Sequence, residues 1–146
     1  MEVLQYGQLL FIITSIVTLI VLKSQRKNMD IIRKNVFYYS VIPSLAYSTI
    51  GHLFLGKNIR KAMNWGDSTG VITLQRELGI TQLTMFIVAC FSTNNPQYIG
   101  SLWGLMLVLM GSNHFAITKK FSAVGLIDII YGFTLLGIYS PKILQN

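Results

Sequence analysis

The chain has 146 residues, of which 52% are hydrophobic and only 12% charged, and its mean hydropathy is +0.54. Average soluble domains carry about 25% charged residues, so this composition argues against a soluble globule and predicts an integral membrane protein. The net charge of +7 does not indicate nucleic-acid binding, because the basic residues lie between apolar runs, where lipid headgroups and topology signals act.

The first predicted element is the apolar run 4–22, close to the roughly 20 residues with which a helix crosses a bilayer. Glu2 stands where a removable signal peptide carries basic residues, so we predict a retained span. The segment that follows, 23–35, carries five basic residues, as many as the loops on the opposite face. Because the first helix usually sets the orientation, we predict that loop 23–35 is cytoplasmic and that the protein lies in the plasma membrane.

Four further apolar runs predict four further membrane helices in a single domain over residues 1–146. Pro43, near the start of the second run, predicts a mild kink. Gly100 and Gly104 suit close helix packing, either within the bundle or between copies in a homo-oligomer. The predicted fold is an all-α, polytopic membrane bundle of about five transmembrane helices, a four-helix core plus an N-terminal span. The predicted spans are 4–22, 36–55, 71–91, 98–117 and 124–139, with a polar loop at 56–70.

Four ionisable residues stand on four different predicted spans, all at a similar depth: His52, Glu77, His114 and Asp128. Consecutive spans alternate in direction, so the end of one and the start of the next share a membrane face. Each residue lies one or two turns from that face, within roughly 10 Å of it. Charge inside a bilayer is costly and marks functional sites. We predict that the four converge on one site, although each alone also fits a structural role as an interfacial histidine, an ion pair or a helix cap.

Polar stripes accompany these residues on the second and third spans. Ser44 and Ser48 share a face with His52. The third span carries two adjacent stripes, Thr73, Glu77, Thr81 and Thr84 in one, and Gln75, Gly79 and Gln82 in the other. Spacings of three and four residues keep each stripe on one helix face, which we expect to meet protein or water. The predicted substrate-binding companions of the site are Trp65, Gln75, Arg76, Asn113 and Tyr131.

Two histidines and two carboxylates suit a divalent metal such as zinc, iron or manganese, or a proton relay beside a quinone. Arg76 adds a fixed cation for an anionic or carbonyl-bearing ligand. The sequence has no HExxH or CxxCH motif, so these residues predict a site without naming a reaction, and whether the protein is an enzyme stays open. Cys90, the only cysteine, excludes an internal disulfide and is predicted to be buried within its span.

Five short motifs occur in order along the chain. They are Gly51-His52, Trp65-Gly66, Gln75-Arg76-Glu77-Leu78-Gly79, Gly111-Ser112-Asn113-His114 and Gly125-Leu126-Ile127-Asp128. This set resembles an uncharacterised family of small prokaryotic membrane proteins within the DoxX-like group. The segment from Trp65 to Gln75 departs from the family pattern, which puts a shared ligand in doubt. The resemblance implies a four-helix core and the same polar positions. DoxX itself is named for a subunit of a thiosulfate:quinone oxidoreductase, whereas relatives include assembly and trafficking factors.

Three functions follow as hypotheses. The first is a redox- or quinone-linked membrane protein or accessory subunit, with quinone or a divalent metal as cofactor. The second is a carrier for a small solute or ion, which needs a polar path to both membrane faces. The third is a structural or assembly subunit of a membrane complex. The predicted partners are membrane lipid and either a further copy of the chain or a larger complex, without nucleic acid.

Overall fold

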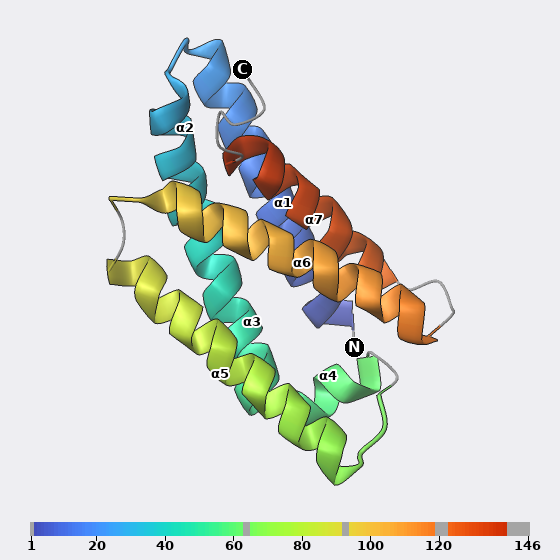
Figure 1. Ribbon diagram of the computed structural model, residues 1–146. Helices are drawn as coiled ribbons and strands as arrows, with labels where there is room; N and C mark the ends of the chain where they lie inside the picture. Colours follow the sequence, from blue (N-terminus) through green and yellow to red (C-terminus); the bar gives the residue numbers. More distant parts are fainter. Residues whose placement is uncertain (1, 63–64, 92–93, 119–122, 140–146) are drawn as a thin grey trace.

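The computed structural model describes residues 2–62, 65–91, 94–118 and 123–139. Within these ranges the chain is helical and has no strand, which confirms the predicted all-α class (Figure 1). The elements are α1 (Glu2–Ser24), α2 (Met29–Val36), the π-helical turn η1 (Phe37–Val41), α3 (Ile42–Phe54), α4 (Gly56–Ala62), α5 (Thr69–Phe91), α6 (Pro96–Thr118) and α7 (Ala123–Tyr139).

The second predicted span, 36–55, forms the C-terminal part of a longer helical rod. In this rod α2, η1 and α3 follow one another without a break. The kink expected at Pro43 takes the form of a wide turn, because the Ile42 N–H bonds to the Phe37 carbonyl, five residues back. Proline lacks an N–H and its ring clashes with the carbonyl four residues earlier in a regular helix. A π-turn directly before Pro43 relieves that clash, and such turns occur frequently at functional sites.

The predicted polar loop 56–70 contains the additional helix α4. The chain continues almost directly from α3 into α4, since the Leu55 carbonyl accepts hydrogen bonds from the N–H groups of Asn58 and Ile59. Ile59 then folds back onto α3 beside Gly51, where a side chain on Gly51 would come within 2.9 Å of it. One apolar residue within a polar segment therefore anchors this helix.

The helices pack in two neighbouring groups that the α2–η1–α3 rod connects (Figure 1). In one group α6 and α7 lie antiparallel and in contact at glycines, and α1 packs on α7. In the other, α5 packs mainly on α3. Gly100 and Gly104 face Tyr139 and Gly132 of α7, so this glycine pair is used inside the bundle. Its close fit lets the α6 and α7 backbones approach one another.

The surface of the described structure is rich in large apolar side chains, and its interior holds polar residues beside an apolar core. Exposed apolar side chains of α1, α5, α6 and α7 include Leu10, Phe91 and Phe133, and the described buried residues include fourteen hydrophobic and ten polar or charged ones. By length and composition, α1 over Gly7–Ser24 and α6 over Pro96–Ala116 can cross a membrane, and α7 is a shorter apolar helix. Cys90, predicted to be buried, is exposed, because it follows Ala89, the last residue of the face that α5 packs inward.

Candidate functional site

A row of buried polar residues follows η1 and α3 at four-residue spacing: Ser40, Ser44, Ser48 and His52. We call this row the α3 polar track. Residues four apart lie on one face of a helix, and the track spans about 18 Å at 1.5 Å per residue. None of its four members is more than 8% exposed. The interior of this protein is therefore polar along most of α3.

The first half of the track is a satisfied hydrogen-bond network. The Tyr131 hydroxyl donates to Ser44 Oγ at 3.1 Å and lies 2.7 Å from Ser40 Oγ. Ser15 donates to Ser40 Oγ at 2.7 Å, and the Trp103 indole N–H donates to Ser44 Oγ at 2.9 Å. These bonds tie α1, α6 and α7 to the rod at the π-turn. Fully satisfied networks of this kind fix the packing of a core.

Buried atoms that lack partners occur in and beside the second half of the track. Within the described ranges, the buried side-chain atoms without a hydrogen bond are Thr49 Oγ1, His52 Nδ1, both amide atoms of Gln82 and, on α7, Asp128 Oδ1. Gln82 itself is fully buried. Buried polar atoms are nearly always bonded in native proteins, so each exception needs an explanation, such as a bound ligand.

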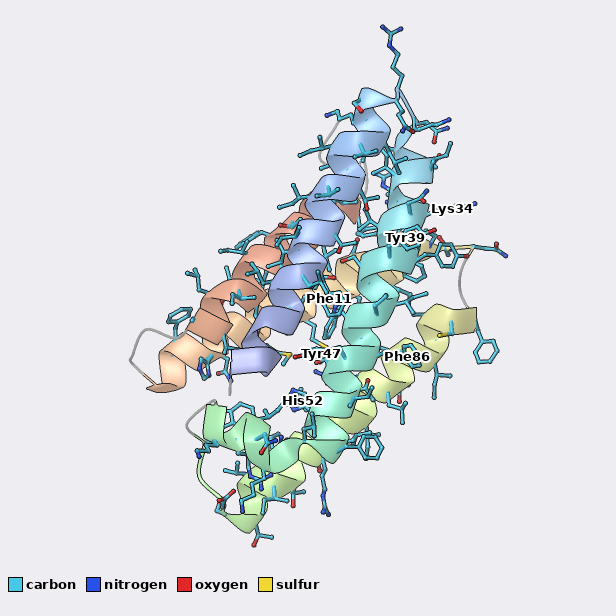
Figure 2. All side chains as sticks on the ribbon, turned by 180° about the vertical axis from the view of Figure 1, so that it is seen from behind. Phe11, Lys34, Tyr39, Tyr47, His52 and Phe86 are labelled. Atoms are coloured by element: carbon cyan, nitrogen blue, oxygen red, sulfur yellow. The ribbon has the colours of Figure 1, made fainter. Side chains whose placement is uncertain are left out.

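Four of these five unpaired atoms, all except Asp128 Oδ1, belong to one interface, between α3 and α5. The two helices run antiparallel, since Gln75 of α5 donates to the Gly56 carbonyl at 3.0 Å and Gly79 lies beside His52. Continuing this register by three residues in each direction places Gln82 level with Thr49. We call Thr49, His52 and Gln82 the unpaired cluster. Figure 2 shows His52 on the part of α3 beyond Tyr47, which packs on Phe11 of α1.

At the α4 end, one turn beyond His52, the track continues into a charged cluster. Arg60 of α4 donates to Gln75 Oε1 at 2.6 Å and to Asp67 at 2.7 Å. Gln75 is buried, whereas the side chain of Asp67 is 68% exposed. The polar interior therefore reaches the molecular surface at this end.

At its other end the track stops at an apolar layer. Ile32, Val36 and Phe37 of the rod are fully buried and lie level with the last turn of α2, which also carries Arg33 and Lys34. At this level Arg33 donates to the Ile138 carbonyl at 2.9 Å, and the Tyr139 hydroxyl donates to the Arg33 carbonyl at 2.8 Å. The polar track is open toward one end of the bundle and closed toward the other.

The four ionisable residues predicted to converge lie in different surroundings. His52 faces α5, whereas His114 lies against Gly125 of α7. Asp128 is buried and hydrogen-bonded to Gln8 of α1. Glu77 is exposed. Among the described residues no three His, Cys, Asp or Glu side chains come together as metal ligands would, so the metal hypothesis has no ligand group in this part of the chain.

The predicted companions also separate. Tyr131 belongs to the satisfied network, and Gln75 to the charged cluster. Trp65 is partly buried next to α4, where its N–H bonds to the Arg60 carbonyl at 2.8 Å. Arg76 and Asn113 are exposed.

Sequence reasoning missed Ser15, Ser40, Thr49 and Trp103 as parts of the buried polar interior. A signal for Ser40 was present, because it extends the spacing of Ser44, Ser48 and His52 by one further step. No comparable pattern marks Ser15 or Trp103, which reach the network from other helices.

No protein-family model matches the chain, and neither a curated protein nor a solved structure does.

Proposed function

We propose that this chain is an integral membrane protein in which α1, the α2–η1–α3 rod, α5, α6 and α7 each cross the bilayer. The exposed apolar side chains support this proposal, because lipid solvates such groups and leaves polar groups to pair inside. Leu10, Phe91, Leu109 and Phe133 are each more than half exposed. In water, so many large apolar groups on several faces would cause aggregation. Alkaline extraction of native membranes tests the proposal: the protein should stay in the pellet, and release into the supernatant contradicts it.

We propose further that the α1–α2 end faces the cytoplasm at the plasma membrane. Lys23, Arg26, Lys27 and Lys34 are exposed at that end, and Figure 2 shows Lys34 there. Such a cluster beside the first span favours the cytoplasmic side. In a Cys90→Ser background, a Lys27→Cys variant should react with a membrane-impermeant thiol reagent only after the cells are lysed. Labelling of intact cells would reverse the orientation.

For the function itself, we propose that the unpaired cluster binds the polar head of a small, lipid-soluble ligand of the quinone class. The observation that carries this proposal is the grouping of Thr49 Oγ1, His52 Nδ1 and the Gln82 amide without partners at one helix interface. Each such buried atom costs about 1–3 kcal/mol unless something binds to it. A hydroxyl, an imidazole and an amide offer hydrogen bonds to quinone carbonyls, and His52 can also exchange a proton.

Of the redox role predicted from the sequence, we propose the binding of the quinone for this chain. Reduction of a bound quinone also needs an electron donor. An electron donor in a partner protein would make the chain an accessory subunit. Because the cluster atoms are buried, access requires α3 and α5 to separate locally. That separation is feasible, since α5 packs mainly on α3 alone.

The two other hypotheses gain unequal support. A carrier needs a polar path to both faces, whereas Ile32, Val36 and Phe37 close one end of the track. A structural role is favoured by the satisfied network, in which Tyr131 and Trp103 hold three helices to the rod. This second function is compatible with the first, because the two use different halves of the α3 polar track.

Titration of the purified, lipid-extracted protein with a short-chain ubiquinone analogue tests the proposal, with tryptophan fluorescence as the readout. Thr49→Val and Gln82→Met should each raise the Kd about tenfold, because each removes hydrogen bonds to the ligand. Thr134→Val is the matched control, since the Thr134 hydroxyl bonds only to the Ile130 carbonyl of its own helix. Absence of quinone binding by the wild-type protein, or equal binding by all variants, would refute the proposal.

A further inference from the structure

The outer face of α5, opposite its contact with α3, carries a stripe of exposed residues. We call Thr73, Glu77, Ile80, Thr84, Ile87 and Phe91 the α5 outer stripe; every member is exposed. Their spacing alternates between four and three residues, which is the seven-residue repeat of helices that pair side by side. The face that packs inward is a different set and includes Gln75, Gly79 and Gln82.

Among the acidic residues whose side chains the structure describes, Glu77 alone has no side-chain hydrogen bond or ion pair. Asp30 and Asp67 form ion pairs, and Asp128 is hydrogen-bonded within the bundle. Arg76, next to Glu77, is likewise exposed, and neither side chain takes part in a hydrogen bond or ion pair within the described part of the chain. One unpaired anion and one unpaired cation therefore stand side by side on the same helix surface.

The membrane setting makes this arrangement costly. Glu77 lies eight residues into α5, about 12 Å from its start at 1.5 Å per residue. Ionisable side chains at such a depth almost always face protein or a water-filled cavity rather than lipid. Thr84 of the stripe poses no such problem, since its hydroxyl bonds to the Ile80 carbonyl of its own helix. This step rests on the proposed insertion of α5 in the bilayer.

We propose that a second copy of this chain covers the α5 outer stripe, with the two α5 helices parallel and Arg76 of each copy paired with Glu77 of the other. Two copies inserted with the same orientation present parallel α5 helices around a two-fold axis. In a parallel pair of this repeat, the side chain at position 77 enters a gap lined by residues 73, 76, 77 and 80 of the other helix. Each Glu77 thus meets an Arg76, and the interface is neutral.

Charge complementarity is what selects a second copy as the partner. The surface carries both members of the ion pair next to one another, so it is complementary to itself, as a two-fold interface must be. The glycine pair of α6 does not compete for this role, because Gly100 and Gly104 are already covered by α7.

Cysteine cross-linking in membranes tests the arrangement. In a Cys90→Ser background, Ile87→Cys places a thiol within the stripe, and Ile130→Cys places one on the outer face of α7. The two isoleucines are a matched pair, since each is 46% exposed. Oxidation should convert the Ile87→Cys protein to a species of twice the 16.4 kDa chain mass and leave the Ile130→Cys protein monomeric. Equal cross-linking of both, no cross-linking at Ile87→Cys, or a product with a different protein overturns the proposal.

Charge reversal tests the ion pair separately from folding. Arg76→Glu and Glu77→Arg should each weaken dimerisation about tenfold in detergent or lipid. The double variant, which carries both reversals, should recover wild-type dimerisation, and a failure to recover refutes the pairing. A protein that stays in alkali-extracted membranes as a monomer overturns only the dimer, whereas one that is extracted by alkali overturns the membrane proposal.

Discussion

The same substitution at two glutamines of α5 should have opposite effects on stability. Gln75 and Gln82 both lie on the inward face of the helix and are both buried. Gln75 is fully engaged, since it accepts from Arg60 at 2.6 Å and donates to the Gly56 carbonyl at 3.0 Å. Both amide atoms of Gln82 lack partners in the described structure. Methionine has a similar length and volume, so Gln→Met changes polarity while leaving little cavity.

The magnitudes follow from these contacts. Gln82→Met removes a buried, unbonded amide and should raise the free energy of unfolding by about 2 kcal/mol in the ligand-free protein. Gln75→Met leaves the Gly56 carbonyl and one Arg60 N–H group without partners and should lower it by about 2 kcal/mol. Hydrogen bonds between membrane helices are often worth less than in water, so the opposite signs matter more than the sizes.

Equilibrium unfolding of the lipid-extracted protein in mixed detergent micelles, followed by circular dichroism, measures both variants against the wild type. The reasoning is refuted if Gln82→Met is destabilised, or if the two variants shift in the same direction. Adding the quinone analogue supplies an internal check. It should stabilise the wild-type protein more than Gln82→Met, because the stabilisation by a ligand of the folded state grows with the logarithm of its affinity.

Two further substitutions have matched controls, and both are read out by the same unfolding measurement. Gly132→Ala should destabilise by about 1–3 kcal/mol, because its Cβ would lie 2.6 Å from the Gly104 carbonyl oxygen. Gly137→Ala on the same helix is the control, because a Cβ there meets nothing within 4 Å, and it should be neutral or stabilising by up to about 1 kcal/mol. An equal loss of stability in both variants would contradict the close approach of α6 and α7. Tyr131→Phe should lower the free energy of unfolding by about 1–2 kcal/mol, because it loses the bonds to Ser40 and Ser44. Tyr98 is 74% exposed, so Tyr98→Phe should leave the stability unchanged. Equal stability of the two variants would argue against the network.

Hydropathy was sufficient to predict the long helices but not the joints between them. The runs that became α1, α5, α6 and α7 begin and end within a few residues of the predicted limits. Pro43 predicted a kink, yet only the three-dimensional structure gives its form, because a π-turn depends on which carbonyl the Ile42 N–H reaches. Helix α4 depends on the contact of Ile59 with Gly51, and such a tertiary contact has no local signature.

For the candidate site residues, the sequence predicted how far along a helix each residue lies better than the direction in which its side chain points. Counting residues from the span ends gives a level for Glu77, and it gives Gln75 nearly the same level. The two side chains nevertheless point about 200° apart around α5, at 100° per residue. Both stripes of α5 are polar, so composition alone does not decide which one turns inward. Packing on α3 decides it, and this places Gln75 and Gln82 inside and Glu77 outside.

The bond between Gln8 and Asp128 has a consequence for the order of assembly during synthesis. It joins the first helix to the last, and α1 packs on α7. Helix α1 therefore leaves the ribosome long before α7 exists, and until α7 arrives it can pack only on the α2–η1–α3 rod. The hairpin of α3 and α5 can close early, whereas the group of α1, α6 and α7 closes only after α7 is made. Any chain that ends before α7 leaves α1 packed on the rod alone, where Ser15 bonds to Ser40.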